Sequence, residues 1–347
     1  MTLFKRFSVI TLLSLLISQS CSKKNPIAPE LPPVYHQDGD VAKVMFNRPD
    51  GVNIVFLGDG FTKEDLKENG KYDSLVRKLT NFFFTAEPFK QYKNYFNVYQ
   101  VYAESKVRGA ANTYTPDRTK FDAYFGTVNG RDLRNGNFDA SLQYAVKAVS
   151  FYEISLLVML VNDDRYGGTG GSIATVSSDQ WAQYTFLHEA GHTFAGLADE
   201  YVEDSIANNY PVSMLPYLPN VDNTSDLAKI KWAHLLEHQA YRPVVGAYEG
   251  AYYRKQGIYR PEVTSIMKDI NVARFNAPSR EAIVRTIHSR MGLPFDLNAF
   301  IKDDARNVQS ISAAPSLQIP PLQHDFIDLK QRVTDLHNLR HRDASRK

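Results

Sequence analysis

The sequence has very little cysteine and almost no net charge. A single Cys among 347 residues excludes a disulfide framework within the chain and every structural zinc site built from cysteines. The 40 Lys and Arg nearly balance the 38 Asp and Glu, so the charge gives no reason to expect nucleic acid as a partner. The sequence is instead rich in apolar residues, at 43%, with 20 Tyr and 20 Phe, which predicts a folded body rather than a disordered chain.

Long apolar segments are also scarce, and the first one indicates export. After two basic residues, the apolar stretch from Val9 to Ile17 is shorter than the roughly 20 residues that cross a bilayer. Small residues then lead to Cys21, a pattern that resembles the cleavage site of bacterial lipoproteins, in which the cysteine is acylated. We therefore predict a signal peptide at residues 1–20, a membrane anchor through lipid at Cys21, and a place on the outer membrane or cell surface. Because Ser18 stands where the usual lipoprotein signal has Leu, a plain secretory signal and a periplasmic or secreted protein stay open.

The rest of the chain divides into a tether, a body and a tail. Residues 21–45 begin with a polar stretch that contains four prolines, which is typical of a tether. Residues 46–295 carry the patterns of a single globular domain. Residues 296–347 contain a second linker with prolines, and then apolar residues between Phe326 and Leu339 at the spacing of a short amphipathic helix.

Within the body, strand patterns alternate with helix patterns. Two continuous apolar runs, Val52–Leu57 and Ile154–Val161, predict buried strands, and the aromatic and β-branched segment Phe96–Ala103 predicts a third. A helical pattern follows Thr62, which is a suitable N-cap, and another covers Asn137–Val149. Strands and helices in this order predict an α/β fold with a mostly parallel, twisted sheet.

A dense group of glycines follows the strand that ends at Val161. Four of the five residues from Gly167 to Gly171 are glycine, and a short β-like segment comes next. Because glycine permits tight turns and close approach of the backbone to a ligand, we interpret this group as a turn into an edge strand. An extended substrate could pair with such a strand through main-chain hydrogen bonds. The residues predicted to form this substrate edge strand are Gly170, Gly171, Ser172 and Ile173.

His188, Glu189 and His192 form the motif with the clearest chemistry. On a helix, His188 and His192 lie one turn apart on the same face, so both imidazoles can reach a single Zn²⁺ ion. Glu189 can then point at a water molecule at the metal and act as a general base. A catalytic zinc also takes a third protein ligand and leaves one position for water. The helix is expected to end at Gly196, because glycine commonly ends a helix in the left-handed conformation.

The segment from His188 to Tyr201, HEAGHTFAGLADEY, resembles the signature of the bacterial IgA-peptidase family of zinc metallopeptidases, a metzincin-like group. In metzincins the third ligand follows three residues after the glycine that ends the active-site helix. Counted from Gly196, this resemblance implies Asp199, with Glu200 as the alternative, because a one-residue change in the turn would exchange them. The resemblance covers about residues 46–295. It implies a catalytic domain with a zinc cofactor and a protein or peptide substrate.

The same resemblance implies a Met-turn and leaves the oxyanion-stabilising residue open. Ser265-Ile-Met267 is similar to the metzincin Met-turn, which places Met267 beneath the metal site in a smaller C-terminal subdomain. Some metzincins carry a Tyr two residues after this Met, where the present chain has Asp269. Another group must then stabilise the oxyanion of the tetrahedral intermediate, and Tyr259 is our catalytic candidate, with Tyr201 as a second.

These features predict a secreted, membrane-anchored zinc endopeptidase that hydrolyses peptide bonds of extracellular or host proteins. Several family members carry a β-sandwich ahead of the catalytic domain, and the segment 21–45 leaves no room for one, so we expect it to be absent. The alternative function is a non-catalytic envelope lipoprotein that binds host glycoprotein or polysaccharide, and a zinc hydrolase of a non-peptide amide also stays open. We interpret Tyr252 and Tyr253 as core or cleft residues. The sequence gives no indication of the oligomeric state.

Overall fold

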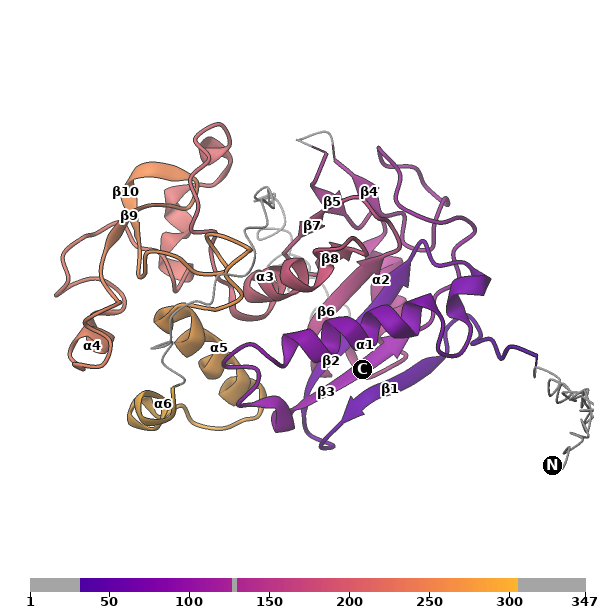
Figure 1. Ribbon diagram of the computed structural model, residues 1–347, viewed down its shortest axis with the longest axis horizontal. Coiled ribbons are helices and arrows are strands. Elements are labelled where there is room, and N and C mark those ends of the chain that lie inside the picture. Colours follow the sequence, from indigo (N-terminus) through magenta and orange to yellow (C-terminus); the bar gives the residue numbers. More distant parts are fainter. Residues whose placement is uncertain (1–31, 127–129, 305–347) are drawn as a thin grey trace, which may run out of the picture. The chain divides into compact units, whose positions relative to one another are not determined.

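The computed structural model describes residues 32–126 and 130–304 (Figure 1). The predicted signal peptide, Cys21, most of the predicted tether and the predicted C-terminal helix lie outside these residues. The chain divides into a short unit, Met1–Pro33, and a body, Val34–Lys347, and every helix and strand that the structure describes belongs to the body. None of the described helices is long and apolar enough to span a membrane.

A six-stranded sheet forms the framework of the body (Figure 1). Its strand order is β1-β3-β2-β6-β8-β7. The pairs β3–β2, β2–β6 and β6–β8 are parallel, whereas β1 and β7 run antiparallel at the two edges. This confirms the predicted α/β fold with a mostly parallel sheet. The strands are β1 (Val41–Phe46), β2 (Val52–Asp59), β3 (Phe96–Val101), β6 (Ile154–Val161), β7 (Gly168–Thr169) and β8 (Ala174–Ser177).

Helices pack on both faces of this sheet because its central strands are apolar on both faces. In β2, Ile54 and Phe56 join a hydrophobic cluster with α1, α3 and α5, while Val55 and Leu57 join a second cluster with α2. Helix α3 also contacts β6, β8 and α5, which fixes its position beside the edge of the sheet. The bounds of these helices are α1 (Lys71–Phe83), α2 (Phe138–Ala145), α3 (Ala182–Ala195) and α5 (Ala277–Arg290).

The chain between α3 and α5 has little regular structure and contributes to two hydrophobic clusters, the second of which it shares with α5 and α6. One cluster includes Tyr201 and Tyr253, and another surrounds Trp232. Whether this region is the smaller subdomain of a metzincin stays a prediction. The remaining elements are α4 (Ala233–Leu236), α6 (Leu297–Asp303), the hairpin of β9 (Tyr248–Ala251) and β10 (Arg254–Arg260), the short pair β4 (Tyr124–Phe125) and β5 (Leu133–Arg134), and 3-10 helices at Lys63–Leu66, Lys93–Tyr95, Phe151–Glu153, Ala207–Asn209 and Val212–Tyr217.

Regular structure extends past both predicted ends of the catalytic domain. Strand β1 begins at Val41, inside the predicted tether 21–45, and pairs with β3. Its residues alternate between exposed and half-buried, so no continuous apolar run marks it in the sequence. At the other end, α6 follows residue 295, and the carboxylate of Asp296 caps it by accepting hydrogen bonds from backbone N–H groups of its first turn.

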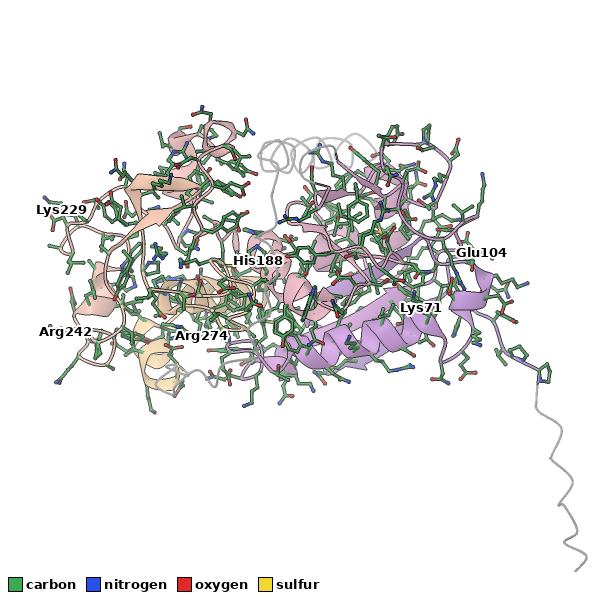
Figure 2. All side chains as sticks on the ribbon, turned by 45° about the horizontal axis from the view of Figure 1, so that its top comes forward. Lys71, Glu104, His188, Lys229, Arg242 and Arg274 are labelled. Atoms are coloured by element: carbon green, nitrogen blue, oxygen red, sulfur yellow. The ribbon has the colours of Figure 1, made fainter. Side chains whose placement is uncertain are left out.

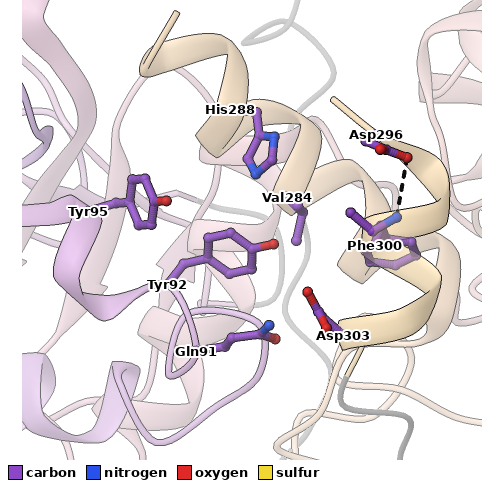
Figure 3. Close-up of a pocket in the computed structure, with 9 residues that line it drawn as sticks. Gln91, Tyr92, Tyr95, Val284, His288, Asp296, Phe300 and Asp303 are labelled. Carbon is purple, nitrogen blue, oxygen red and sulfur yellow. Dashed lines mark hydrogen bonds between the residues drawn. The ribbon is translucent and has the colours of Figure 1, made fainter. Parts of the chain in front are cut away.

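A pocket of about 300 Å³ lies against α5 and α6 (Figure 3). The rings of Tyr92 and His288 meet edge to face in its wall, with centroids 5.8 Å apart. The lining residues are Gln91, Tyr92, Tyr95, Val284, His288, Asp296, Ala299, Phe300 and Asp303. No site residue predicted from the sequence lines this pocket, so the candidate metal centre is elsewhere.

Candidate metal centre

Helix α3 carries both predicted histidine ligands. His188, labelled in Figure 2, lies on this helix one turn before His192. His188 is 4% exposed. The helix ends as predicted at Gly196, which has a φ of +66° and donates its N–H to the carbonyl of His192. The chain can therefore turn back sharply after α3, and the residues that follow Gly196 return to the histidines.

Backbone carbonyls fix the orientation of both imidazole rings. His188 Nδ1 lies 2.9 Å from the carbonyl oxygen of Ile266, and His192 Nδ1 lies 2.6 Å from that of Leu197. Because a carbonyl oxygen only accepts hydrogen bonds, each Nδ1 carries a proton and donates it, so in the neutral rings the lone pair is on Nε2. The two Nε2 atoms are 3.1 Å apart. In this tautomer both histidines can bind one metal ion through Nε2.

Asp199 completes a triangle with the two histidines. Its Oδ1 lies 3.2 Å from Nε2 of His188 and 3.4 Å from Nε2 of His192, and the residue is 2% exposed. Ligand atoms around a tetrahedral zinc, at bonds of about 2.0–2.1 Å, are separated by about 3.3 Å. The donor atoms therefore have the spacing of three corners of a zinc tetrahedron. Burial alone would lower the pKa of His192, but the nearby Asp199 carboxylate outweighs this and raises it.

Glu200, the alternative third ligand, has different surroundings. It is fully buried, and its carboxylate accepts hydrogen bonds from Asn220 Nδ2 at 2.8 Å, Asn276 Nδ2 at 2.5 Å and Ser265 Oγ at 2.6 Å. Its backbone N–H donates to the carbonyl of Met267. Burial raises the pKa of Glu200 to about 7, although these three donors oppose the shift. The structure thus places Asp199 beside the histidines and uses Glu200 to join distant segments.

Glu189 lies next to the histidine nitrogens and is fully buried. One ligand atom from each of His188, Glu189 and His192 lies within 4.8 Å of the others, so this group could hold a metal ion. Burial raises the pKa of Glu189 well above its ordinary value of 4.5, and the nearby Asp199 and Asp132 carboxylates raise it further. A carboxylate with a raised pKa is a stronger base than an exposed one, which suits proton transfer from water.

The edge strand differs in position from the prediction. The strand at the edge is β7, residues 168–169, and the predicted Gly170, Gly171, Ser172 and Ile173 form the turn that joins β7 to β8. Glycine is needed because the backbone here runs close against α3. A Cβ atom on Gly168 would lie 3.0 Å from Glu189 Oε1, and one on Gly170 would lie 2.6 Å from His192 Cβ. The glycines therefore mark the contact of the edge strand with α3.

Met267 lies directly against α3. It is fully buried, in a turn where the N–H of Lys268 donates to the carbonyl of Ser265. A Cβ atom on Gly191 would lie 2.9 Å from its sulfur, so the side chain packs against the helix between the two histidines. The neighbouring carbonyl of Ile266 is the acceptor for His188. Its role as a metzincin Met-turn stays a prediction.

The two tyrosines predicted near the oxyanion have different surroundings. Tyr259 is half-buried in β10 and packs against the cluster around Trp232. Tyr201 is 7% exposed, and its ring packs edge to face on Tyr253, with centroids 5.2 Å apart. A third tyrosine, Tyr253, which its sequence context predicts only as a core or cleft residue, contacts the candidate ligand directly. Its hydroxyl donates a hydrogen bond to Oδ2 of Asp199. No local spacing in the sequence indicates this contact, which joins residues 54 apart.

A model of a known protein family matches the part of the chain that contains all of these residues. The sequence model of the family described as IgA Peptidase M64 matches residues 45–244 and 235–287, which is more than half of the chain. The chain belongs to this family. Its M64 region includes the three candidate ligands, Glu189, Tyr253 and Met267, and membership indicates a metallopeptidase that binds protein or peptide substrates. A search of curated proteins finds no match to this M64 peptidase.

Proposed function

We propose that the protein is an exported, membrane-anchored zinc endopeptidase that hydrolyses peptide bonds of extracellular or host proteins. The observation that carries this proposal is the convergence of His188 Nε2, His192 Nε2 and Asp199 Oδ1 at 3.1–3.4 Å, with Glu189 beside them. Membership of the M64 family supports the peptidase class. The name of the family does not identify the substrate of this chain.

The donor set fits Zn²⁺. It consists of two imidazole nitrogens and one carboxylate oxygen, a combination found in catalytic zinc sites that keep one position open. His188, His192 and Asp199 would hold the ion. Bound there, Zn²⁺ would lower the pKa of a water molecule toward about 7 and polarise the carbonyl of the scissile bond.

The residues around the ligands would carry out the proton transfers and align the substrate. Glu189 would accept the proton of the attacking water and later deliver it to the amine that leaves, and its raised pKa supports both steps. Gly168 of β7 already pairs with Asp132, so an extended peptide would form its main-chain hydrogen bonds with the predicted substrate segment that follows, from Gly170 to Ile173. Tyr259 is the proposed oxyanion-stabilising residue, and Met267 would support the ligand helix from below.

Replacement of the general base tests this function. Glu189→Gln keeps the size of the side chain but removes the base, so we expect peptide cleavage to fall by roughly 10²–10⁴-fold while bound zinc stays stoichiometric. Cleavage is measured on a mixed peptide library, and zinc by elemental analysis. The control is Glu237→Gln, an exposed glutamate in the loop after α4, which should behave as the wild type. Wild-type turnover in Glu189→Gln would exclude the mechanism.

The second candidate, a non-catalytic lipoprotein that binds glycoprotein or polysaccharide, is not favoured. Such a binder needs neither fixed histidine tautomers nor a buried glutamate next to them, and this chain has both. A purified protein that takes up no stoichiometric zinc and cleaves no peptide in the library would instead support the binder.

A further inference from the structure

The turn between β9 and β10 has an unusual sequence for its geometry. Ala251 pairs with Arg254, so Tyr252 and Tyr253 are the only two residues of the hairpin loop. Both have positive φ values, +50° and +67°. Two-residue hairpin loops with positive φ at both positions favour Asn-Gly, because the left-handed conformation is strained for a residue with a Cβ. The turn geometry alone therefore does not account for two tyrosines.

The backbone of this turn lies along the segment that carries Asp199. The N–H of Tyr252 donates to the carbonyl of Asp199 at 2.9 Å, and the N–H of Tyr253 donates to the carbonyl of Tyr201 at 3.0 Å. In return, the N–H of Glu203 donates to the carbonyl of Tyr253 at 2.9 Å. These hydrogen bonds offset the strain of the turn and fix the position of the Asp199 segment.

The side chain of Tyr253 is held by packing and by a hydrogen bond. It is 1% exposed, and its ring packs between Tyr201 and Tyr210, with centroid distances of 5.2 Å and 4.0 Å. Its hydroxyl donates to Oδ2 of Asp199, while Oδ1 of the same carboxylate faces the two histidine nitrogens. One oxygen of Asp199 is thus engaged by tyrosine, and the other is directed at the candidate metal position.

We propose that Tyr253 is a positioning residue that makes Asp199 a ligand through one oxygen only. This inference rests on the proposed zinc function. A carboxylate can bind a metal through one oxygen or both, and the second oxygen would take a coordination position that a catalytic zinc leaves to water. The hydroxyl of Tyr253 binds Oδ2 and so leaves Oδ1 as the ligand atom.

Removal of this single hydroxyl tests the inference. Tyr253→Phe keeps the ring and its packing, so we expect zinc affinity, measured by competition with a chelator, to fall by about 10–100-fold. In the Co²⁺-substituted protein, we expect weaker visible absorption, because this absorption declines when a four-coordinate site gains a fifth ligand. The matched control is Tyr252→Phe on the same turn, since the Tyr252 hydroxyl is also buried but has no hydrogen-bond partner in the described structure. The control should keep the affinity and spectrum of the wild type.

The outcomes separate the inference from the function on which it rests. Wild-type zinc affinity and an unchanged Co²⁺ spectrum in Tyr253→Phe would overturn the positioning role while leaving the zinc site in place. A wild-type protein that binds no zinc would instead overturn the proposed function, and the inference with it. Circular dichroism of the metal-free variants is the second measurement. A Tyr253→Phe protein that loses zinc because it is unfolded would assign the hydroxyl to folding and overturn the proposal.

Discussion

Asp199 and Glu200 are adjacent acids whose surroundings differ completely. Asp199 faces two histidine nitrogens, whereas Glu200 accepts hydrogen bonds from two asparagines and a serine. Backbone hydrogen bonds fix which acid takes which place: the carbonyl of Asp199 binds the N–H of Tyr252, and the N–H of Glu200 binds the carbonyl of Met267. The β9–β10 turn therefore holds Asp199, and the turn that contains Met267 holds Glu200.

Substitution of each acid should affect a different property. Asp199→Asn removes the charge from a ligand, so zinc affinity should fall by more than the roughly 10–100-fold that loss of a supporting residue costs. Glu200→Gln replaces Oε2, the acceptor of the Ser265 hydroxyl, with an amide donor, so the free energy of unfolding should fall by about 1–3 kcal/mol while the proposed ligands stay in place. Chelator competition and urea unfolding measure the two effects. A greater loss of zinc affinity in Glu200→Gln would make Glu200 the ligand.

Local residue patterns predicted part of this centre, and long-range contacts determine the rest. The spacing of His188 and His192 and the helix end at Gly196 depend on a single segment, so the sequence was sufficient to predict them. Tyr253 lies 54 residues from Asp199, and its hydroxyl reaches that carboxylate only because the β9–β10 turn lies along the chain after α3. In the sequence it is one of 20 tyrosines, with no spacing that distinguishes it.

Among the elements, those with continuous apolar runs were predicted and those at the edges were not. Strands β2 and β6 are buried along almost their whole length, and the apolar runs that predicted them coincide with them closely. Helix α1 begins only at Lys71, after Gly70, because the predicted N-cap Thr62 precedes a short 3-10 helix, Lys63–Leu66, instead. The two-residue edge strand β7 is too short for any periodicity, and its position depends on contact with α3.

The contact between α4 and α5 predicts a dependence of stability on pH. His234 Nε2 lies 2.7 Å from Glu281 Oε2. This hydrogen bond raises the pKa of His234 above 6.5, and although burial alone would raise the pKa of Glu281, the same bond brings it below 4.5. The stability that His234 contributes is fully present below its pKa in the unfolded chain. It is lost as the pH rises through the raised pKa of the folded protein. That of Glu281 is present above pH 4.5 and is lost as pH falls through the lowered pKa, so the pair stabilises most between 4.5 and 6.5.

Replacement of His234 should therefore destabilise the protein more in mildly acidic solution than in alkaline solution. Because the side chain of His234 is 35% exposed, we expect His234→Gln to lower the free energy of unfolding by less than about 1 kcal/mol, mainly between pH 4.5 and 6.5. Urea unfolding at several pH values measures the difference. The control is His238→Gln, which forms no ion pair among the described residues. An equal loss of stability at acidic and alkaline pH would contradict the role of the His234–Glu281 pair.

At the scale of the whole molecule, the predicted export and lipid anchor can be tested without reference to the fold. If Cys21 is acylated, the wild type should incorporate labelled fatty acid and be found in the membrane fraction. Cys21→Ser should lose the label and be released into the soluble fraction with its proposed peptidase activity retained, because the residues of the candidate metal centre all lie between positions 188 and 267. A wild-type protein without label, recovered in the soluble fraction, would favour the plain secretory signal.

With two tyrosines, the β9–β10 turn has a strained backbone, but it also has a buried ring and a hydrogen bond to Asp199. Asn-Gly at these positions would relax the left-handed backbone and make the hairpin easier to form. The same replacement would leave a cavity where the buried ring of Tyr253 packs between Tyr201 and Tyr210, and it would remove the hydroxyl that binds Asp199, so both stability and the position of this acid would suffer. A library designed to raise the thermal stability of the protein should therefore leave this turn unchanged and vary residues on the solvent-exposed faces of the helices.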